Sequence, residues 1–485
     1  MAGSEKKEVI IEERDGIGRI THRWLHNTTS QKITPVRPAH HNTLPTLTTA
    51  LTTSTTTGLA NMRQILYDAF LPIGYPDSVT PDYLGYQTFD SLQAFFSTIT
   101  GLLANRAILQ GLGVGDADSS ATYALLLTIL KDGISRVATI VFAYRFGLVI
   151  EPECKRYRFL ADIFNDSAFF LDLFSPYFDP WTKVLALVLA EALRAMCGVA
   201  AGASKAALSK HFARRNNLSE LNAKEASQET AVGLVGLLAG SVIVRYVESR
   251  EAVFALMVAL VFVHLGMNYL GVRCVQLNVL NQQRATILFK HYMQTKRVLS
   301  PAQVAARENI IFWTPIVKDQ RGQVITKIGF AKSYAHAMTA DLKSARVRFV
   351  TPTWEGGQHQ KSMGRQGQKA LPGFVLCICE RGDIATVRIL LLGDHSLAEA
   401  NDLSTLTAWY YATMLAHDRT LAAKTGTRKL LLGAISVDEI EMGDGVEMLD
   451  LQALEEAGWD VKEANLDAFA PRISSSGVEE KKKEL

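Results

Sequence analysis

Residues 181–275 constrain the fold most, because long apolar runs alternate there with short polar ones. The apolar runs cover residues 181–203, 230–247 and 252–275, and roughly 20 helical residues cross the hydrocarbon core of a bilayer. The turn at residues 248–251 is entirely polar, as expected of a hairpin between two spanning helices. This pattern predicts helices that cross a membrane.

Two of these apolar runs contain glycines four residues apart, Gly198 with Gly202 and Gly236 with Gly240. Such a pair clears one face of a helix, so that a second helix backbone can approach closely. Short glycine spacings are also common in any apolar helix. A packing contact and an incidental spacing therefore both remain open at each pair.

The polar run at residues 209–230 separates two of the predicted spanning helices. Its capping pattern predicts a helix that begins near Ser227, with Glu229 in the first turn. One interpretation is a surface that faces an anion, and the other is a cytoplasmic loop that follows the positive-inside rule. The basic residues in and beside this run are Lys205, Lys210, His211, Arg214, Arg215 and Lys224.

Charged residues also lie within the apolar runs. A charge at the centre of a spanning helix costs about 2.5–3.5 kcal/mol, so each such residue needs a partner or a wet cavity. The spacings allow an ion pair within each group, three or four residues apart. They mark either a functional site or ion pairs that lock helices together. The residues are Lys131, Asp132 and Arg136 in one run, and Glu191 and Arg194 in another.

Residues 151–172 predict an amphipathic helix. Asp162 and Asp166 share one face of it and can accept hydrogen bonds from Arg158. The segment contains no histidine and no ligand-bearing loop, so it does not predict a metal site.

Several classes of function find no support in the composition. The net charge of +3 is too small for a nucleic-acid binder, and five scattered cysteines form neither a disulfide framework nor a zinc set. We find no complete catalytic motif, and we predict no catalytic residue, cofactor or metal. The glycines of residues 111–115 could cradle a phosphate or simply connect two helices, and no predicted strand precedes them.

The predicted fold is a mainly α multi-pass helical membrane bundle with a smaller C-terminal α+β soluble domain. Acidic residues near the start fit neither a secretory signal nor a transit peptide. Basic residues after residue 273 place the C-terminal domain on the cytosolic or matrix side. The expected boundaries are 1–60 for a disordered, threonine-rich segment, 61–300 for the membrane domain, 301–472 for the α+β domain and 473–485 for a charged tail.

The motifs FLPIGYPDSVTPDYLGYQTFDSLQAFFS, LKDGISRVATIVFAYRFG and KRYRFLADIFNDSAFFLDL resemble the root UVB sensitive (RUS) family, also described as vitamin B6 photoprotection and homeostasis proteins. The resemblance runs from Phe70 to Thr230 and continues more loosely to about residue 300. It implies a multi-pass membrane protein linked to vitamin B6 homeostasis and the UV-B response.

The family motifs also indicate which residues carry the function. These positions join the charged residues named above as candidates for binding or moving a ligand. From the resemblance they are Lys131, Asp132, Lys155, Arg158, Asp162, Asn165, Asp166, His211, Arg214, Asn216, Gln228 and Glu229, and the charge pattern adds Arg136 and Lys205.

Three hypotheses follow for the function. The first is a membrane protein that binds or moves a small anionic solute, such as a B6 vitamer. The second is a membrane-anchored scaffold whose C-terminal domain recruits a partner. The third is an enzyme that uses Lys131, Lys205 or His211, although none of them belongs to a recognisable catalytic arrangement. The expected partners are the lipid membrane, the solute and either a RUS-family paralogue or a second copy of the chain, and not nucleic acid.

Overall fold

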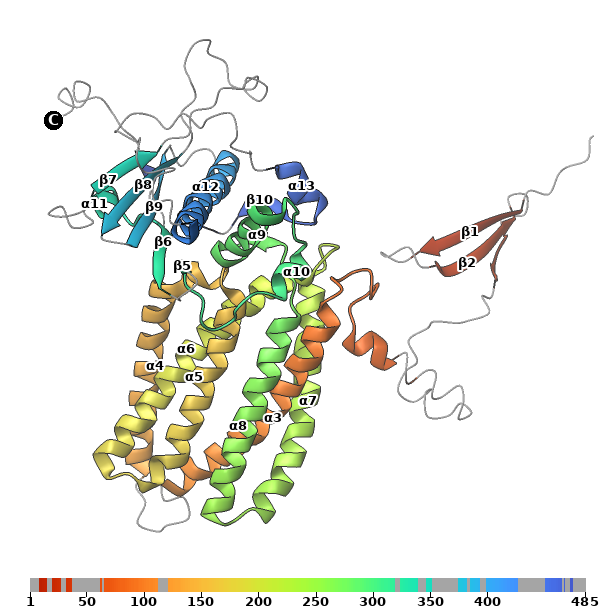
Figure 1. Ribbon diagram of the computed structural model, residues 1–485. Helices are drawn as coiled ribbons and strands as arrows, with labels where there is room; N and C mark the ends of the chain where they lie inside the picture. The colour runs from red at the N-terminus through yellow and green to blue at the C-terminus, as the bar shows by residue number, and fades with distance from the viewer. Residues whose placement is uncertain are drawn as a thin grey trace, which may run out of the picture.

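The computed structural model describes residues 8–14, 20–27, 32–36, 62, 65–111, 121–318, 323–338, 346–350, 374–381, 384–392, 398–425, 450–464, 466 and 472–473. Long helices form a bundle, and a part that contains a sheet lies at one end of it (Figure 1).

A small antiparallel sheet precedes the bundle, within the segment that the sequence predicts to be disordered. Its order is β1–β2–β3, with β1 at Glu8–Arg14, β2 at Ile20–Asn27 and β3 at Lys32–Val36. Val9, Ile10 and Ile11 are β-branched, and such side chains favour strands. The threonine-rich run at residues 42–58 lies outside the described residues.

The bundle consists of long helices joined by short connections, so consecutive helices run antiparallel (Figure 1). The closest helix pairs are α5 with α6, α3 with α8, α4 with α6, and α3 with α7. The helices are α3 (Tyr83–Gly111), α4 (Ala121–Ile150), α5 (Cys154–Phe174), the short 3-10 helix η1 (Ser175–Tyr177), α6 (Pro180–Phe212), α7 (Leu218–Tyr246) and α8 (Arg250–Cys274).

The connection between α6 and α7 is much shorter than the sequence predicts. It covers only residues 213–217, because α7 begins at Leu218 and its N-cap is Asn217. The prediction of a helix start at Ser227 was therefore wrong. Residues 218–229 are polar but rich in Leu, Ala, Glu and Lys, which are strong helix formers. The polarity of this run marks an exposed helix end and not a loop.

The outer surface of the bundle is apolar. Three of the described helices, α6, α7 and α8, are long and apolar enough to cross a membrane. Large side chains on outer faces remain exposed, with 68% of Ile140, 64% of Leu238 and 73% of Phe262 accessible. Soluble monomers rarely expose apolar patches of large extent. The bundle surface therefore suits contact with lipid.

Only one of the two glycine pairs is a packing contact. A Cβ atom at Gly236 would lie 3.1 Å from the carbonyl oxygen of Phe95 in α3, and one at Gly240 would lie 2.5 Å from Leu102. A Cβ atom at Gly198 or Gly202 would have no heavy atom within 4 Å. The pair in α7 therefore permits close approach to α3, whereas the pair in α6 does not serve the packing.

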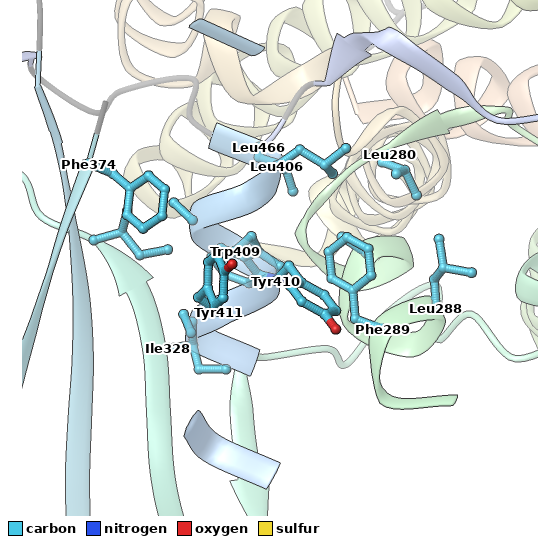
Figure 2. Packing of buried hydrophobic residues seen from close by; sticks show 14 of the residues in the cluster. Leu280, Leu288, Phe289, Ile328, Phe374, Leu406, Trp409, Tyr410, Tyr411 and Leu466 are labelled. Atoms are coloured by element: carbon cyan, nitrogen blue, oxygen red, sulfur yellow. The ribbon is translucent and has the colours of Figure 1, made fainter. Parts of the chain in front are cut away.

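The C-terminal part has its own core, shown in Figure 2. Trp409 and Tyr410 lie at its centre, and the Trp409 ring stacks on Phe330 with 5.4 Å between the ring centroids. Leu288 and Phe289 also belong to this core. Because they come from α9 (Gln282–Thr295), the C-terminal core begins before the boundary at residue 301 that the sequence suggests.

A six-stranded sheet with the order β5–β6–β9–β8–β7 supports this core, and β11 pairs with the end of β9. Its strands are β5 (Ile316–Lys318), β6 (Val324–Phe330), β7 (Arg346–Val350), β8 (Phe374–Arg381), β9 (Ile384–Leu392) and β11 (Arg472–Ile473). A parallel pair joins β4 (Val279–Leu280) to β10 (Asp460–Ala464). The helices are α9 (Gln282–Thr295), α10 (Pro301–Ala305), α11 (Tyr334–Met338), α12 (Ala398–Thr425) and α13 (Leu451–Glu456).

Candidate functional site

A pocket of about 430 Å³ lies where the bundle meets the C-terminal part. The end of α6, the residues before α3, the connection from α8 to β4, and β10 form its walls. Basic and acidic side chains face each other across it, so a ligand with both an anionic and a cationic group would find partners there. The charged lining residues are Asp82, Glu151, Lys210, His211, Arg214, Arg284, Asp460 and Glu463.

His211 and Asp82 form a fixed pair in the pocket wall. The His211 Nε2 atom lies 3.0 Å from Oδ2 of Asp82, which also accepts a hydrogen bond of 2.6 Å from the Gln276 backbone N–H. Burial alone would raise the pKa of the Asp82 carboxyl, but the hydrogen bond and charge of His211 outweigh it and lower that pKa to about 2. Asp82 is therefore a carboxylate at neutral pH.

Arg214 and Lys210 are the accessible cations of the pocket. Lys210 forms an exposed ion pair of 2.8 Å with Glu463 of β10. The backbone N–H of Arg214 donates to the Ser78 carbonyl, which fixes the chain, while its guanidinium is exposed and has no recorded ion pair among the described residues. Arg214 is thus positioned by its backbone and is free to meet an anion.

A buried ion triplet adjoins the pocket and joins the bundle to the C-terminal part. Glu308 accepts a 2.9 Å hydrogen bond from Arg284 of α9 and contacts the Lys155 ammonium of α5. Burial favours the neutral acid, but the two cations outweigh it and lower the pKa of Glu308. The pKa of nearby Glu153 is raised by burial. Lys155 is therefore engaged in a structural ion pair.

The deepest polar cluster lies inside the bundle between α3, α5 and α8. Arg158 donates to Asp90 at 2.6 Å and to Asp162 at 3.2 Å. His264 Nδ1 lies 2.9 Å from Asp166, and its Nε2 lies 3.6 Å from Asp162.

Asn268 completes this cluster by donating to Asp162 and to the Arg158 carbonyl. All six residues are less than a tenth exposed. The cluster is therefore buried within the described part of the bundle.

Sequence reasoning placed three members of this cluster on one face of α5 but missed the others. Asp90 lies in α3, and His264 and Asn268 lie in α8. His264 and Asn268 are four residues apart in an apolar helix, a spacing that puts two polar side chains on one face. That spacing was the signal that could have found them.

A second ion network lies toward the other end of the bundle. Arg194 contacts Asp172 of α5 and lies 3.5 Å from Glu191, as the spacing within α6 predicts. Lys131 of α4 lies 3.4 Å from Glu191. The network therefore joins three helices and uses Lys131 as a link between α4 and α6.

The remaining candidates do not join either cluster. Asp132 and Arg136 are exposed on α4, and no ion pair between them is recorded among the described residues. Asn165 is half-buried beside the cluster, with no side-chain hydrogen bond recorded in the part of the chain that is described. Asn216 adopts a left-handed backbone conformation with φ of 53° in the turn after α6.

Lys205, Glu229 and Gln228 have structural contacts near the start of α7. Lys205 and Glu229 form an ion pair between α6 and α7, and Gln228 donates to the Phe70 carbonyl. The described residues include no group of three or more His, Cys, Asp or Glu side chains that could hold a metal ion. The glycines at residues 113 and 115 lie outside the described residues.

Comparison with known proteins gives the family. Residues 57–296 match the model of the vitamin B6 photo-protection and homoeostasis domain, a stretch that contains the whole bundle and α9. RUS family member 1 of Dictyostelium discoideum is 39% identical over 252 residues, which cover 51% of this chain and 48% of that protein. Protein root UVB sensitive 3 of Arabidopsis thaliana is 35% identical over 267 residues, which cover 55% of this chain and 60% of that protein.

The chain thus matches about half of the length of the first relative and 60% of the second. No solved structure matches it. Through the domain at residues 57–296, which carries most of the pocket wall and the whole Arg158 cluster, the chain belongs to the root UVB sensitive (RUS) family, which is linked to vitamin B6 homeostasis and the UV-B response.

Proposed function

We propose that this protein is a multi-pass membrane protein that binds a small anionic solute at its end pocket and moves it across the membrane. Three helices of sufficient length and apolarity support the membrane setting, as do the exposed apolar faces of α4, α7 and α8. The basic residues at the pocket end favour the cytosolic or matrix side for the C-terminal part.

The observation that carries the proposal is the mixed charge of the 430 Å³ pocket. Pockets for small molecules occupy about 300–1,000 Å³. Arg214 and Lys210 can bind an anionic group, and Glu151 and Asp460 can accept from a protonated nitrogen. A phosphorylated B6 vitamer carries both kinds of group, a phosphate and a basic ring nitrogen. The family domain is named for vitamin B6, and the proposal assigns such a vitamer as the solute.

Substitution of Arg214 tests the pocket. We expect Arg214→Ala to weaken the binding of pyridoxine 5′-phosphate about tenfold, because a charge-assisted hydrogen bond to phosphate contributes about 1.4 kcal/mol or more. This ligand has no aldehyde, so it does not react with lysine side chains. The measurement is isothermal titration calorimetry of the full chain in detergent micelles.

Arg215→Ala is the matched control, because Arg215 is an exposed neighbour that does not line the pocket. It changes the net charge by the same amount and should leave affinity within about twofold. Equal losses in both variants would reduce the effect to net charge. A wild-type protein that binds neither pyridoxine 5′-phosphate nor pyridoxine would overturn the proposed ligand class.

A further inference from the structure

The cluster around His264 holds more acid than base. Its carboxylates are Asp90, Asp162 and Asp166, and its cations are Arg158 and, when protonated, His264. Arg158 is shared between Asp90 and Asp162. With a neutral imidazole the cluster would carry two uncompensated negative charges inside an apolar bundle, which is an expensive arrangement.

The geometry of His264 also indicates, independently of the charge count, that the cluster lacks a proton when the imidazole is neutral. Its two ring nitrogens face two different carboxylates, Asp166 at 2.9 Å and Asp162 at 3.6 Å. A neutral imidazole has one N–H donor and one lone pair, so one nitrogen would point its lone pair at a carboxylate oxygen. An additional proton, on the ring or on one acid, removes this repulsion.

Two unpaired acceptor atoms also indicate that the cluster has more hydrogen-bond acceptors than donors. The Oδ1 atoms of Asp166 and Asn268 are buried, and neither has a hydrogen-bond donor among the described residues. Buried polar atoms of this kind are rare in folded proteins. The carboxylate of Asp166 therefore has one oxygen whose charge no donor offsets, which favours a proton on the His264 imidazole that contacts its other oxygen.

Beside Arg158, a further cation near Asp90 in the described part of the chain is Lys205 of α6, and Glu229 of α7, which also faces Asp90, pairs with it and cancels its charge. From α3 come Tyr86 and Asp90, and Tyr86 accepts from Arg158. From α6 comes Cys197, whose thiol lies near Asp162 and Asp166 and supplies no positive charge. Arg194 of α6 is held by Asp172 and Glu191. The compensating positive charge must therefore arrive from outside the cluster.

The site is also placed along a polar face of α5. Lys155 and Arg158 lie on the pocket side of it, and Asp172 lies on the far side. Asp166 is twelve residues from the start of α5, or about 18 Å along the helix axis, and eight residues from its end. The cluster therefore lies well inside the bundle, between the end pocket and the second ion network.

We propose that Asp162, His264 and Asp166 form a proton-binding site that couples movement of the solute to movement of one proton. The proton binds to the imidazole of His264 to give an imidazolium that donates to Asp166 and lies within ion-pair distance, 3.6 Å, of Asp162, and it leaves again from the same nitrogen. This role rests on the proposed transport function, and it makes the proton gradient the driving force for movement of the solute. In it, Arg158 and Asn268 are positioning residues that hold Asp162.

Reconstituted full-length protein provides the test. Liposomes that contain it receive external pyridoxine 5′-phosphate under a pH gradient of one unit, acid outside, with the membrane potential clamped at zero. Coupling to one proton predicts about tenfold accumulation, because one pH unit corresponds to a tenfold ratio. Asp166→Asn should abolish this accumulation, while calorimetry should still show binding of pyridoxine 5′-phosphate at the end pocket, which Asp166 does not line. Glu248→Gln, at an exposed turn, is the matched acid control and should accumulate like wild type.

The outcomes separate the two proposals. Wild-type exchange that ignores the pH gradient overturns the proton site and leaves the transport function standing. Absence of both exchange and binding overturns the transport function, and the coupling role with it. His264→Gln serves as a second variant, and infrared difference spectra between acid and alkaline buffer give a readout that needs no solute. A titrating imidazole band that is present in wild type, absent in His264→Gln and shifted in Asp166→Asn supports the site. The lack of such a band in wild type overturns it.

Discussion

At the scale of single residues, one buried arginine holds two helices together. Arg158 of α5 binds Asp90 of α3 and Asp162 of its own helix, and it is only 8% exposed. A buried charge pair adds little net stability compared with apolar residues, but removal of one partner leaves the other charge buried and unpaired. Loss of the arginine would therefore leave the carboxylates of Asp90 and Asp162 buried without their ion-pair partner.

We accordingly expect Arg158→Ala to lower the free energy of unfolding by about 3–5 kcal/mol. The measurement is the thermal unfolding midpoint of the full chain in detergent micelles. Arg156→Ala is the matched control, because Arg156 is exposed two residues away on the same helix and should cost less than about 1 kcal/mol. Comparable losses in the two variants would contradict the role given to the buried network.

At the residue scale, the sequence predicts contacts within one helix but not contacts between helices. Helical spacing predicted that Arg158 and Asp162 share a face and that Glu191 pairs with Arg194, because both relations are local. Asp90 and His264 were missed, since their partners lie far away in the sequence and only helix packing brings them together. The expected pairing of Asp132 with Arg136 is not recorded, although the spacing is the same.

At the scale of elements, apolar length located the helices but not their ends. The run at residues 230–247 is the apolar half of α7, whose first half is polar and packs near α6 and the segment before α3. Of the strands, β8 and β9 consist of apolar runs with β-branched residues, whereas β6 gives a weaker strand pattern because VITKIGF includes a lysine and a glycine in a short segment. The polarity of a segment indicates whether solvent surrounds it, whereas the helix propensity of its residues indicates whether it forms a helix.

The glycine pairs give the prediction at this scale. Gly236→Ala should destabilise the bundle by about 1–3 kcal/mol, because its Cβ atom would press against the Phe95 carbonyl oxygen and the Thr98 side chain of α3. Gly198→Ala should leave stability unchanged or raise it by up to about 1 kcal/mol, because the site is open and alanine favours the helix. Unfolding midpoints of the two purified variants in detergent make the comparison. A larger loss for Gly198→Ala would refute the packing assigned to α7.

At the scale of the whole molecule, the bundle and the C-terminal part share one boundary zone. The sequence suggested that a second domain begins at residue 301, but α9 and β4 already carry side chains that belong to the C-terminal core. Residues beyond 450 return to this zone through β10 and supply Glu463 to the pocket wall. No local pattern reveals such a return, so the pocket could not be found from the sequence.

The setting of the whole molecule is open to a direct measurement, alkaline carbonate extraction of membranes from cells that express the full chain. We expect the protein to stay in the pellet, because the outer faces of α4, α7 and α8 are apolar and carbonate removes only proteins held by charge. A peripheral protein of the same membranes, released into the supernatant, is the control. Release of this chain as well would mean that its apolar faces are covered by protein, and the pocket and the His264 cluster would then have no membrane across which to move a solute or a proton.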